Sequence, residues 1–288
     1  MNKPVIIIGM GEMGELFARG FLKLGFPVYP VLRGQSLERI AKEVIDPELV
    51  LVAVGEGDLD PVLTELPVAW RSRVAVLQNE LMPRDWQRHG LIDPTVIVVW
   101  FDKKKGRPFV SVLPTPVAGP QASLVIRSLQ IIDVPCWEIP DSELLYQMVR
   151  KNLYILTINI AGMRSGGTVS ELWQHHRELA EGLAGEVLAI QAWLAGQPLP
   201  SERLLAGMPS ASGTPANPAL MRWHRASKRP CIRRISSNRR ASTKTAPGLP
   251  SALEAIAIRL TPIVSTGKSP CAGATQRLGS ISLGRFQR

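Results

Sequence analysis

Three glycines near the start of the chain have the spacing of a phosphate-binding turn. Gly9, Gly11 and Gly14 directly follow the four β-branched residues 5–8 and precede an amphipathic, helix-like stretch. The first glycine permits a tight bend, the second lets the backbone approach a pyrophosphate, and the third lets the helix lie close to the strand. The anion then meets free N–H groups at the helix N-terminus. The alternative, a glycine-rich turn without a ligand, is disfavoured by this strand–turn–helix context. We predict that a dinucleotide contacts Gly9, Met10, Gly11, Glu12, Met13 and Gly14.

The residue after the next expected strand distinguishes two nicotinamide cofactors. Residues 26–32 are expected to form that strand, and NAD-binding proteins usually place Asp or Glu at its end to bind the ribose 2′-hydroxyl. This chain has Arg33 there. A guanidinium group can pair bidentately with a 2′-phosphate, whereas a carboxylate would repel it. We therefore predict NADP as the cofactor; a solvated surface arginine is the alternative.

These residues need a scaffold, and the pattern along residues 1–135 predicts one. Continuous apolar runs indicate buried strands, and short helical stretches separate them. Strands that alternate with helices predict an α/β fold, a Rossmann domain with a doubly wound parallel sheet. After residues 5–8 and 26–32, we expect further strands at 49–54, 74–77, 95–101 and 109–113, and helices at 12–24, 36–44, from 60 onward and at 121–132.

Residues 136–208 have the pattern of an all-helical domain, which we expect to be incomplete. A helix apolar on most faces, and therefore buried, is expected over residues 141–163, with Asp141 as its N-cap. A second helix should run from Ser170 to Leu194 with one apolar stripe. Gly196 and a following proline should end it.

The positive charge of the chain is concentrated in its last 80 residues. The formal net charge is +10, and residues 209–288 hold 14 of the 34 Lys and Arg but only one of the 24 acids, a balance of +13 against −3 for residues 1–208. Low hydrophobicity with high net charge predicts a basic tail without regular structure. Nucleic-acid binding by this tail is the least favoured function, because aromatic residues for base stacking are almost absent. A reading-frame shift near residue 208 would also produce such a tail.

Other features of the composition limit cofactors and location. Cys136, Cys231 and Cys271 are odd in number and widely spaced, which indicates neither a disulfide framework nor a metal site. No apolar run approaches the roughly 18 residues of a membrane span, and no signal-peptide pattern precedes Glu12. We therefore expect a cytoplasmic protein that does not bind a membrane.

With these residues in view, the chain resembles the ketopantoate reductases, also called 2-dehydropantoate 2-reductases, over residues 1 to about 205. The resemblance rests on the glycine turn, Arg33, the pair Gln78-Asn79 after the fourth strand, and Lys151 in a buried helix. It implies NADPH-dependent reduction of ketopantoate or a similar 2-oxo acid, and it allows a homodimer. It also implies that Gln78 and Asn79 bind the cofactor and that Asn159 binds substrate.

Lys151 is the expected general acid of this reaction. Reduction of a 2-oxo acid requires a group that neutralises the developing alkoxide, and a lysine in an apolar helix loses solvation, which eases proton donation. Its charge would also stabilise the oxyanion directly. The alternative is a lysine whose ammonium reaches solvent beside Arg150.

Three positions differ from the family pattern that the chain resembles. Glu80 replaces a glycine, Ile155 replaces a substrate-binding asparagine, and residues 55–57 lack the usual lysine. In addition, residues 209–288 match nothing of the family's later helices, which the resemblance implies would supply a serine and a glutamate to the substrate. A cofactor-binding protein without reductase activity therefore stays open as a second function.

Overall fold

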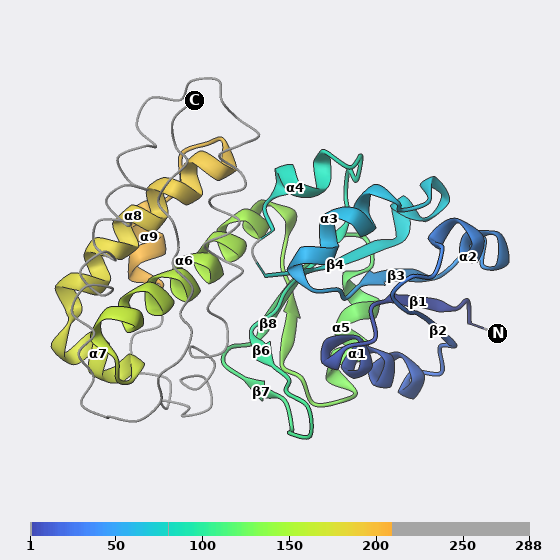
Figure 1. The fold of residues 1–288 in the computed structure, drawn as a ribbon, viewed down its shortest axis with the longest axis horizontal. Helices are drawn as coiled ribbons and strands as arrows, with labels where there is room; N and C mark the ends of the chain where they lie inside the picture. Colours follow the sequence, from blue (N-terminus) through green and yellow to red (C-terminus); the bar gives the residue numbers. More distant parts are fainter. Residues whose placement is uncertain (1, 80, 209–288) are drawn as a thin grey trace, which may run out of the picture.

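The structure, a computed structural model, describes residues 2–79 and 81–208, and Figure 1 shows their arrangement. The expected basic tail at 209–288 lies outside the described residues, as does Glu80. A mostly parallel sheet of seven strands is covered on both faces by helices, and a group of helices alone follows it. The α/β Rossmann-like fold predicted from the sequence is therefore confirmed for the described part of the chain.

The sheet has the strand order β2-β1-β3-β4-β5-β8-β9. Strands β1 to β5 are parallel, β8 runs antiparallel to β5, and β9 pairs parallel with β8. The order reverses at β1, between β2 and β3, and ligands of such sheets bind at the carboxyl ends of the strands beside this switch point. The strands are β1 (Val5–Ile8), β2 (Val28–Val31), β3 (Leu49–Val52), β4 (Val74–Gln78), β5 (Thr95–Val98), β8 (Thr115–Ala118) and β9 (Cys136–Glu138).

Helices on the two faces of the sheet enclose two hydrophobic cores. The helices α1 (Glu12–Lys23) and α5 (Ala122–Gln130) cover one face, where Phe17, Phe21 and Leu129 are completely buried. The core on the other face contains side chains from five helices: α2 (Leu37–Glu43), α3 (Glu56–Thr64), η1 (Val68–Arg73), α4 (Pro83–Gln87) and α6 (Asp141–Ser165). Apolar side chains on alternate faces of β1, β3 and β4 are shared between the two cores, as expected for a parallel sheet buried on both faces.

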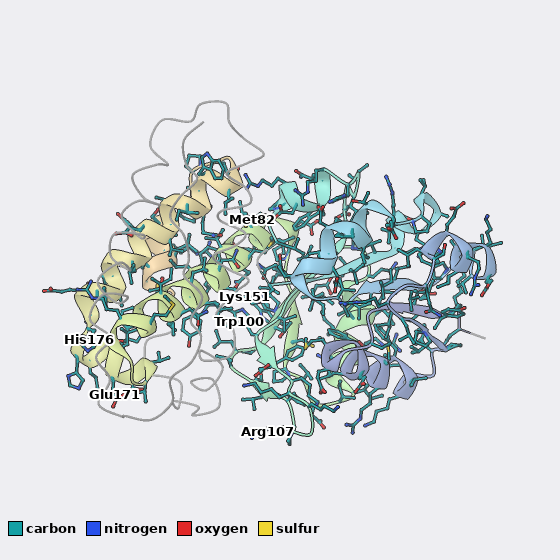
Figure 2. All side chains as sticks on the ribbon, viewed as in Figure 1. Met82, Trp100, Arg107, Lys151, Glu171 and His176 are labelled. Atoms are coloured by element: carbon teal, nitrogen blue, oxygen red, sulfur yellow. The ribbon has the colours of Figure 1, made fainter. Side chains whose placement is uncertain are left out.

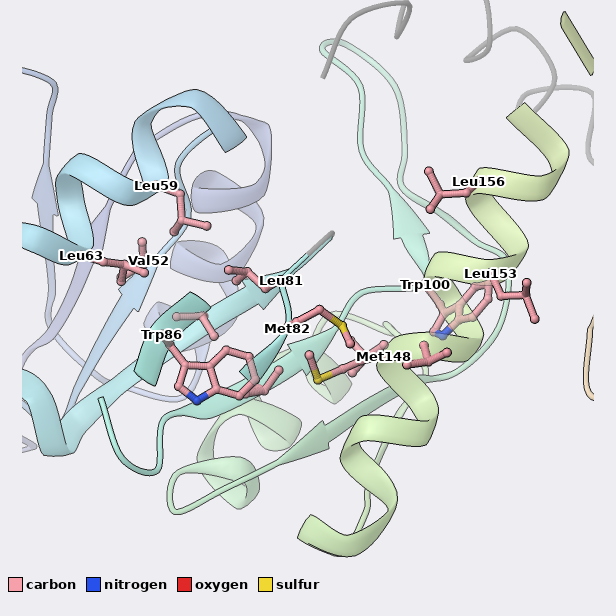
Figure 3. Packing of buried hydrophobic residues seen from close by; sticks show 14 of the residues in the cluster. Val52, Leu59, Leu63, Leu81, Met82, Trp86, Trp100, Met148, Leu153 and Leu156 are labelled. Atoms are coloured by element: carbon pink, nitrogen blue, oxygen red, sulfur yellow. The ribbon is translucent and has the colours of Figure 1, made fainter. Parts of the chain in front are cut away.

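Helix α6 connects the sheet with the remaining helices, α7 (Val169–His175), α8 (Arg177–Ala195) and α9 (Ser201–Ala206). Its Met148 and Leu153 are fully buried in the same core as Met82 and Trp100 of the sheet domain (Figure 3). Along its length α6 also packs against α8. The lysine-bearing helix is therefore held on one side by the sheet and on the other by α8.

Several sequence-based expectations about individual elements were wrong. The strand expected at 95–101 ends at Val98, and the segment expected at 109–113 forms only β7 (Val110–Ser111), which pairs with β6 (Phe101–Asp102) in a separate hairpin. Strands β8 and β9 were not expected. β8 contains a proline and follows another, which is the pattern of a turn, and only its pairing with β5 and β9 makes it a strand.

The helical segment also differs from expectation at two ends. Pro140, and not Asp141, is the N-cap of α6. The single helix expected from Ser170 to Leu194 is two helices, because His176 has the non-helical dihedrals φ −135° and ψ 33°. Thr168 begins the first of them, and its side chain accepts a hydrogen bond from the backbone N–H of Glu171 in a capping box. The second ends at Gly196, as predicted.

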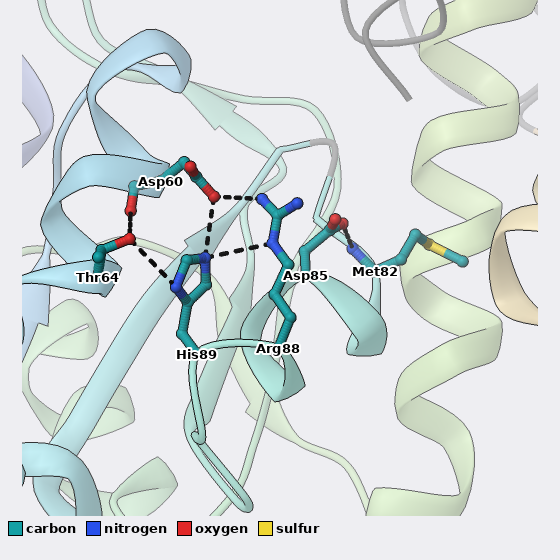
Figure 4. Close-up of polar contacts among 6 residues, drawn as sticks. All are labelled: Asp60, Thr64, Met82, Asp85, Arg88 and His89. Carbon is teal, nitrogen blue, oxygen red and sulfur yellow. Dashed lines mark hydrogen bonds and ion pairs between the residues drawn. The ribbon is translucent and has the colours of Figure 1, made fainter. Parts of the chain in front are cut away.

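A polar cluster joins α3 to the segment that follows α4 (Figure 4). The Asp60 carboxylate accepts a hydrogen bond from Arg88 and lies 2.9 Å from Nε2 of His89. Nearby, the Asp85 carboxylate accepts a 2.9 Å bond from the backbone N–H of Met82, while burial raises the pKa of Asp85. The cluster matters for the site because residues of α3 line both cavities described below.

Candidate functional site

Two adjoining cavities lie at the carboxyl ends of the parallel strands. The larger, the turn cavity, has a volume of about 750 Å³ and is lined by Gly9 to Gly11, Leu32 to Leu37 and residues of α3. The smaller, the lysine cavity, has a volume of about 290 Å³ and is lined by residues including Gln78, Asn79 and Lys151. Val54 and Gly55 line both. The two cavities therefore form one site beside the switch point of the sheet.

The surroundings of the three glycines in the turn differ in how much space they leave for a side chain. Gly9 has φ +97°, and a Cβ there would lie 2.6 Å from the carbonyl oxygen of Ala53. A Cβ on Gly14 would lie 2.0 Å from the carbonyl oxygen of Gly9, so α1 approaches the turn more closely than any side chain would permit. A Cβ on Gly11 would meet nothing within 4 Å. The space beside Gly11 is open, as a pyrophosphate binding against the backbone would require.

The other residues predicted around the turn divide between the two cavities. Met10 lines the turn cavity and Met13 lines the lysine cavity. Glu12 and Gly14 line neither of these cavities within the described residues. The Glu12 carboxylate instead accepts a 2.9 Å hydrogen bond from the ammonium of Lys103, which follows strand β6. This pair neutralises a negative charge at the N-terminus of α1, where an anionic ligand would otherwise be repelled.

Arg33 lines the turn cavity, near the start of the loop that follows β2. Its side chain is 85% exposed, and its guanidinium forms an ion pair with Asp58 of α3, which lines the same cavity. Gly34, Gln35 and Ser36 also line this cavity, and the Ser36 hydroxyl caps α2. A phosphate beside Arg33 would therefore compete with Asp58 for the guanidinium.

The lysine cavity brings together residues that are far apart in the sequence. The Lys151 side chain is only 3% exposed, and its ammonium donates a hydrogen bond to the main-chain carbonyl of Gln78 at the end of β4. Asn79 follows directly and lines the same cavity. Lys151 lies on the part of α6 next to the sheet domain, and Trp100 lines the same cavity (Figure 2). The expectation of a buried lysine is confirmed, and the alternative of an ammonium that reaches solvent is wrong.

The remaining lining of the lysine cavity is mostly apolar, and of the residues described next the sequence analysis singled out only Ile155, as the replacement of a substrate-binding asparagine. Tyr154 and Ile155 follow Lys151 by three and four residues on α6, so they share its helical face, a spacing that the sequence alone could have suggested. Burial raises the pKa of Tyr154, so its hydroxyl stays neutral. The hairpin of β6 and β7 and the residues next to it also line the lysine cavity, with Trp100, Phe101, Asp102 and Val112. Only the folded chain brings them to this cavity.

Asn159, the predicted substrate-binding residue, lies outside this arrangement. It lies eight residues beyond Lys151 on α6, about 12 Å along the helix axis. Within the described residues it lines neither cavity.

The described part of the chain has no group of three His, Cys, Asp or Glu side chains that could hold a metal ion. Nor is any helix found there that is long and apolar enough to span a bilayer.

Solved structures with the same fold include several reductases. A 2-dehydropantoate 2-reductase from Methylococcus capsulatus has a TM-score of 0.61 and 14% identity, over 93% of this chain and 99% of that one. A dimeric ketopantoate reductase from Staphylococcus aureus has a TM-score of 0.52 and 16% identity, over 90% and 99%. D-mandelate dehydrogenase with NADH has a TM-score of 0.50 and 13% identity, over 70% and 77%. No protein-family model and no curated protein sequence matches the chain.

Proposed function

We propose that this chain is an oxidoreductase that uses NADPH to reduce a 2-oxo acid, ketopantoate or a similar branched acid, to the 2-hydroxy acid. One observation carries the proposal: a buried lysine, Lys151, lies beside Asn79 in a cavity that adjoins a glycine turn suited to a dinucleotide. The neighbours in fold support it, because they are reductases and dehydrogenases of such acids, one of them in complex with NADH.

The residues of the turn cavity fit a dinucleotide. The open space at Gly11 admits a pyrophosphate, and the N-terminus of α1 supplies backbone N–H groups to it. Arg33 would pair with the 2′-phosphate after exchanging its contact with Asp58. Gln78 and Asn79, at the end of β4, would flank the nicotinamide, because they line the cavity that continues from the turn. When bound, NADPH supplies the hydride for the reduction.

Lys151 would act as the proton donor. Its ammonium would contact the ketone oxygen of the substrate, stabilise negative charge as the carbonyl is reduced, and transfer one proton to that oxygen. The Gln78 carbonyl restricts where the ammonium can lie, and burial among mostly apolar side chains leaves Lys151 little contact with solvent. Both effects strengthen the interaction with a developing alkoxide, because charges attract more strongly when water is excluded.

The proposal is tested by measuring NADPH oxidation with a panel of 2-oxo acids. Turnover of ketopantoate or another branched 2-oxo acid is expected. NADPH binding without reduction of any acid in the panel would favour the second function, a cofactor-binding protein without reductase activity. Absence of NADPH binding would refute both.

Arg33→Asp is expected to weaken NADPH binding by about 1–3 kcal/mol, the scale of a lost charge-assisted pair. NADH, which lacks the 2′-phosphate, should be affected much less. The matched variant Asp58→Asn is expected to tighten NADPH binding, because it removes both the competing partner of Arg33 and a charge that repels the phosphate. Dissociation constants from nicotinamide fluorescence measure all three effects. Equal affinities of the unmodified protein for NADPH and NADH would contradict the assignment.

Ile155→Asn is expected to improve the recognition of hydroxylated substrates. Ketopantoate and 3,3-dimethyl-2-oxobutanoate differ by one hydroxyl, and Ile155 places an apolar side chain one turn from Lys151 in the cavity. A new hydrogen bond is worth about 0.5–1.5 kcal/mol, so the ratio of kcat/KM for the two acids should shift towards ketopantoate by about two- to tenfold. Ile155→Val, which stays apolar, is the control, and a ratio that moves equally in both variants would argue against this contact.

A further inference from the structure

Three buried side-chain amides form a continuous chain from the sheet to α8. The Gln78 amide nitrogen donates to the Asn152 side-chain oxygen at 3.1 Å, and the Asn152 amide nitrogen donates to the Gln191 side-chain oxygen at 3.0 Å. Their exposed fractions are 0%, 3% and 2%. Gln78 lies at the end of β4, Asn152 on α6 and Gln191 on α8, so the chain crosses three elements.

Two consecutive residues of α6 therefore bind the same residue of the sheet. Lys151 donates to the main-chain carbonyl of Gln78, and Asn152 accepts from its side chain. The Gln78 amide nitrogen also lies 3.3 Å from the carbonyl oxygen of Asn79 and 3.4 Å from that of Leu81. All three acceptor oxygens lie at the nitrogen end of the Gln78 side-chain amide, and they determine which way the amide is oriented. Gln78 Oε1 is buried and has no hydrogen-bond partner among the described residues.

Burial of three amides requires an explanation other than stability. An amide transferred from water to an apolar interior costs free energy, and the hydrogen bonds that it gains there offset this cost with little surplus. Apolar side chains of similar volume would fill the same space between α6 and α8. What the amides add is direction, because hydrogen bonds hold their partners in one geometry whereas apolar contacts do not.

We propose that Asn152 and Gln191 are positioning residues that hold Gln78, and through its carbonyl the Lys151 ammonium, at the lysine cavity. The inference rests on the proposed function, because it concerns the proton donor of that reaction. Gln191 lines neither cavity within the described residues and acts only through Asn152. It therefore provides the sharper test.

The test compares Asn152→Leu and Gln191→Leu in the full chain. Each is expected to lower kcat, about 10- to 100-fold for Asn152→Leu, because small displacements of a catalytic group have effects of that size. The KM for the 2-oxo acid and the dissociation constant of NADPH should change little. The double variant should be no slower than Asn152→Leu alone, since the two residues act in series. Thr157→Val is the matched control, because Thr157 is fully buried on the same helix and its hydroxyl has no partner among the described residues.

A second measurement does not depend on turnover. Acetic anhydride labels lysine amines, and mass spectrometry gives the rate at Lys151 relative to the exposed Lys105. Labelling of Lys151 should accelerate in Asn152→Leu and Gln191→Leu but not in Thr157→Val. Unchanged labelling and unchanged kcat in both variants would overturn the positioning role. Accelerated labelling in a protein that reduces no 2-oxo acid would support the positioning of Lys151 and overturn only the proposed reductase function. If Asn152→Leu does not fold, Gln191→Leu decides the question by itself.

Discussion

Lys151→Ala is expected to lower kcat for the 2-oxo acid by roughly 10²–10⁴, the usual contribution of a positioned proton donor. The ammonium is buried at the lysine cavity and donates a hydrogen bond to the Gln78 carbonyl. No other described lysine or arginine lines that cavity, so none is in place to donate the proton instead. The dissociation constant of NADPH should change little, because the turn cavity does not include Lys151. Steady-state kinetics and nicotinamide fluorescence measure the two quantities.

The control for this variant is Lys105→Ala, which removes an exposed lysine and should retain the activity of the unmodified protein. Reduction by Lys151→Ala at the unmodified rate would show that another group donates the proton. A fall in NADPH affinity as large as the fall in kcat would instead indicate that the substitution disturbs the end of β4, where Gln78 and Asn79 lie.

Alanine at Gly14 and alanine at Gly11 are expected to have opposite effects on folding and binding. A Cβ at Gly14 would lie 2.0 Å from the Gly9 carbonyl oxygen, so α1 or the turn must move. We expect Gly14→Ala to lower the free energy of unfolding by about 1–3 kcal/mol, as overpacking of a close contact does. Gly11→Ala meets no atom within 4 Å, so the fold should tolerate it. NADPH affinity should fall, because the new methyl group occupies the space into which a pyrophosphate would fit.

Chemical denaturation and nicotinamide fluorescence distinguish the two variants. Each variant serves as the control for the other, because both add the same methyl group within the same glycine turn. Full NADPH affinity in Gly11→Ala would contradict the placement of the pyrophosphate at this turn. An unchanged free energy of unfolding in Gly14→Ala would show that α1 can shift away from β1 without penalty.

The sequence by itself determined the parts of the site that depend on neighbouring residues. Four β-branched residues followed by the spacing of Gly9, Gly11 and Gly14 specify a strand, a turn and a helix within about 20 residues, because each requirement is local and steric. The apolar pattern around Lys151 likewise predicted a buried helix, and α6 is one. The alternation of strands and helices was sufficient for the fold class.

The tertiary structure decided what depends on distant partners. β8 becomes a strand only by pairing with β5 and β9, against the local signal of its prolines. Arg33 meets Asp58 because α3 packs beside the loop after β2, and this ion pair had no signal in the spacing. Gln78 and Lys151 are 73 residues apart, and Asn152 and Gln191 are 39 apart. Their hydrogen bonds exist because α6 packs between the sheet and α8, and local residue patterns carry no information about which long-range pairs such packing brings together.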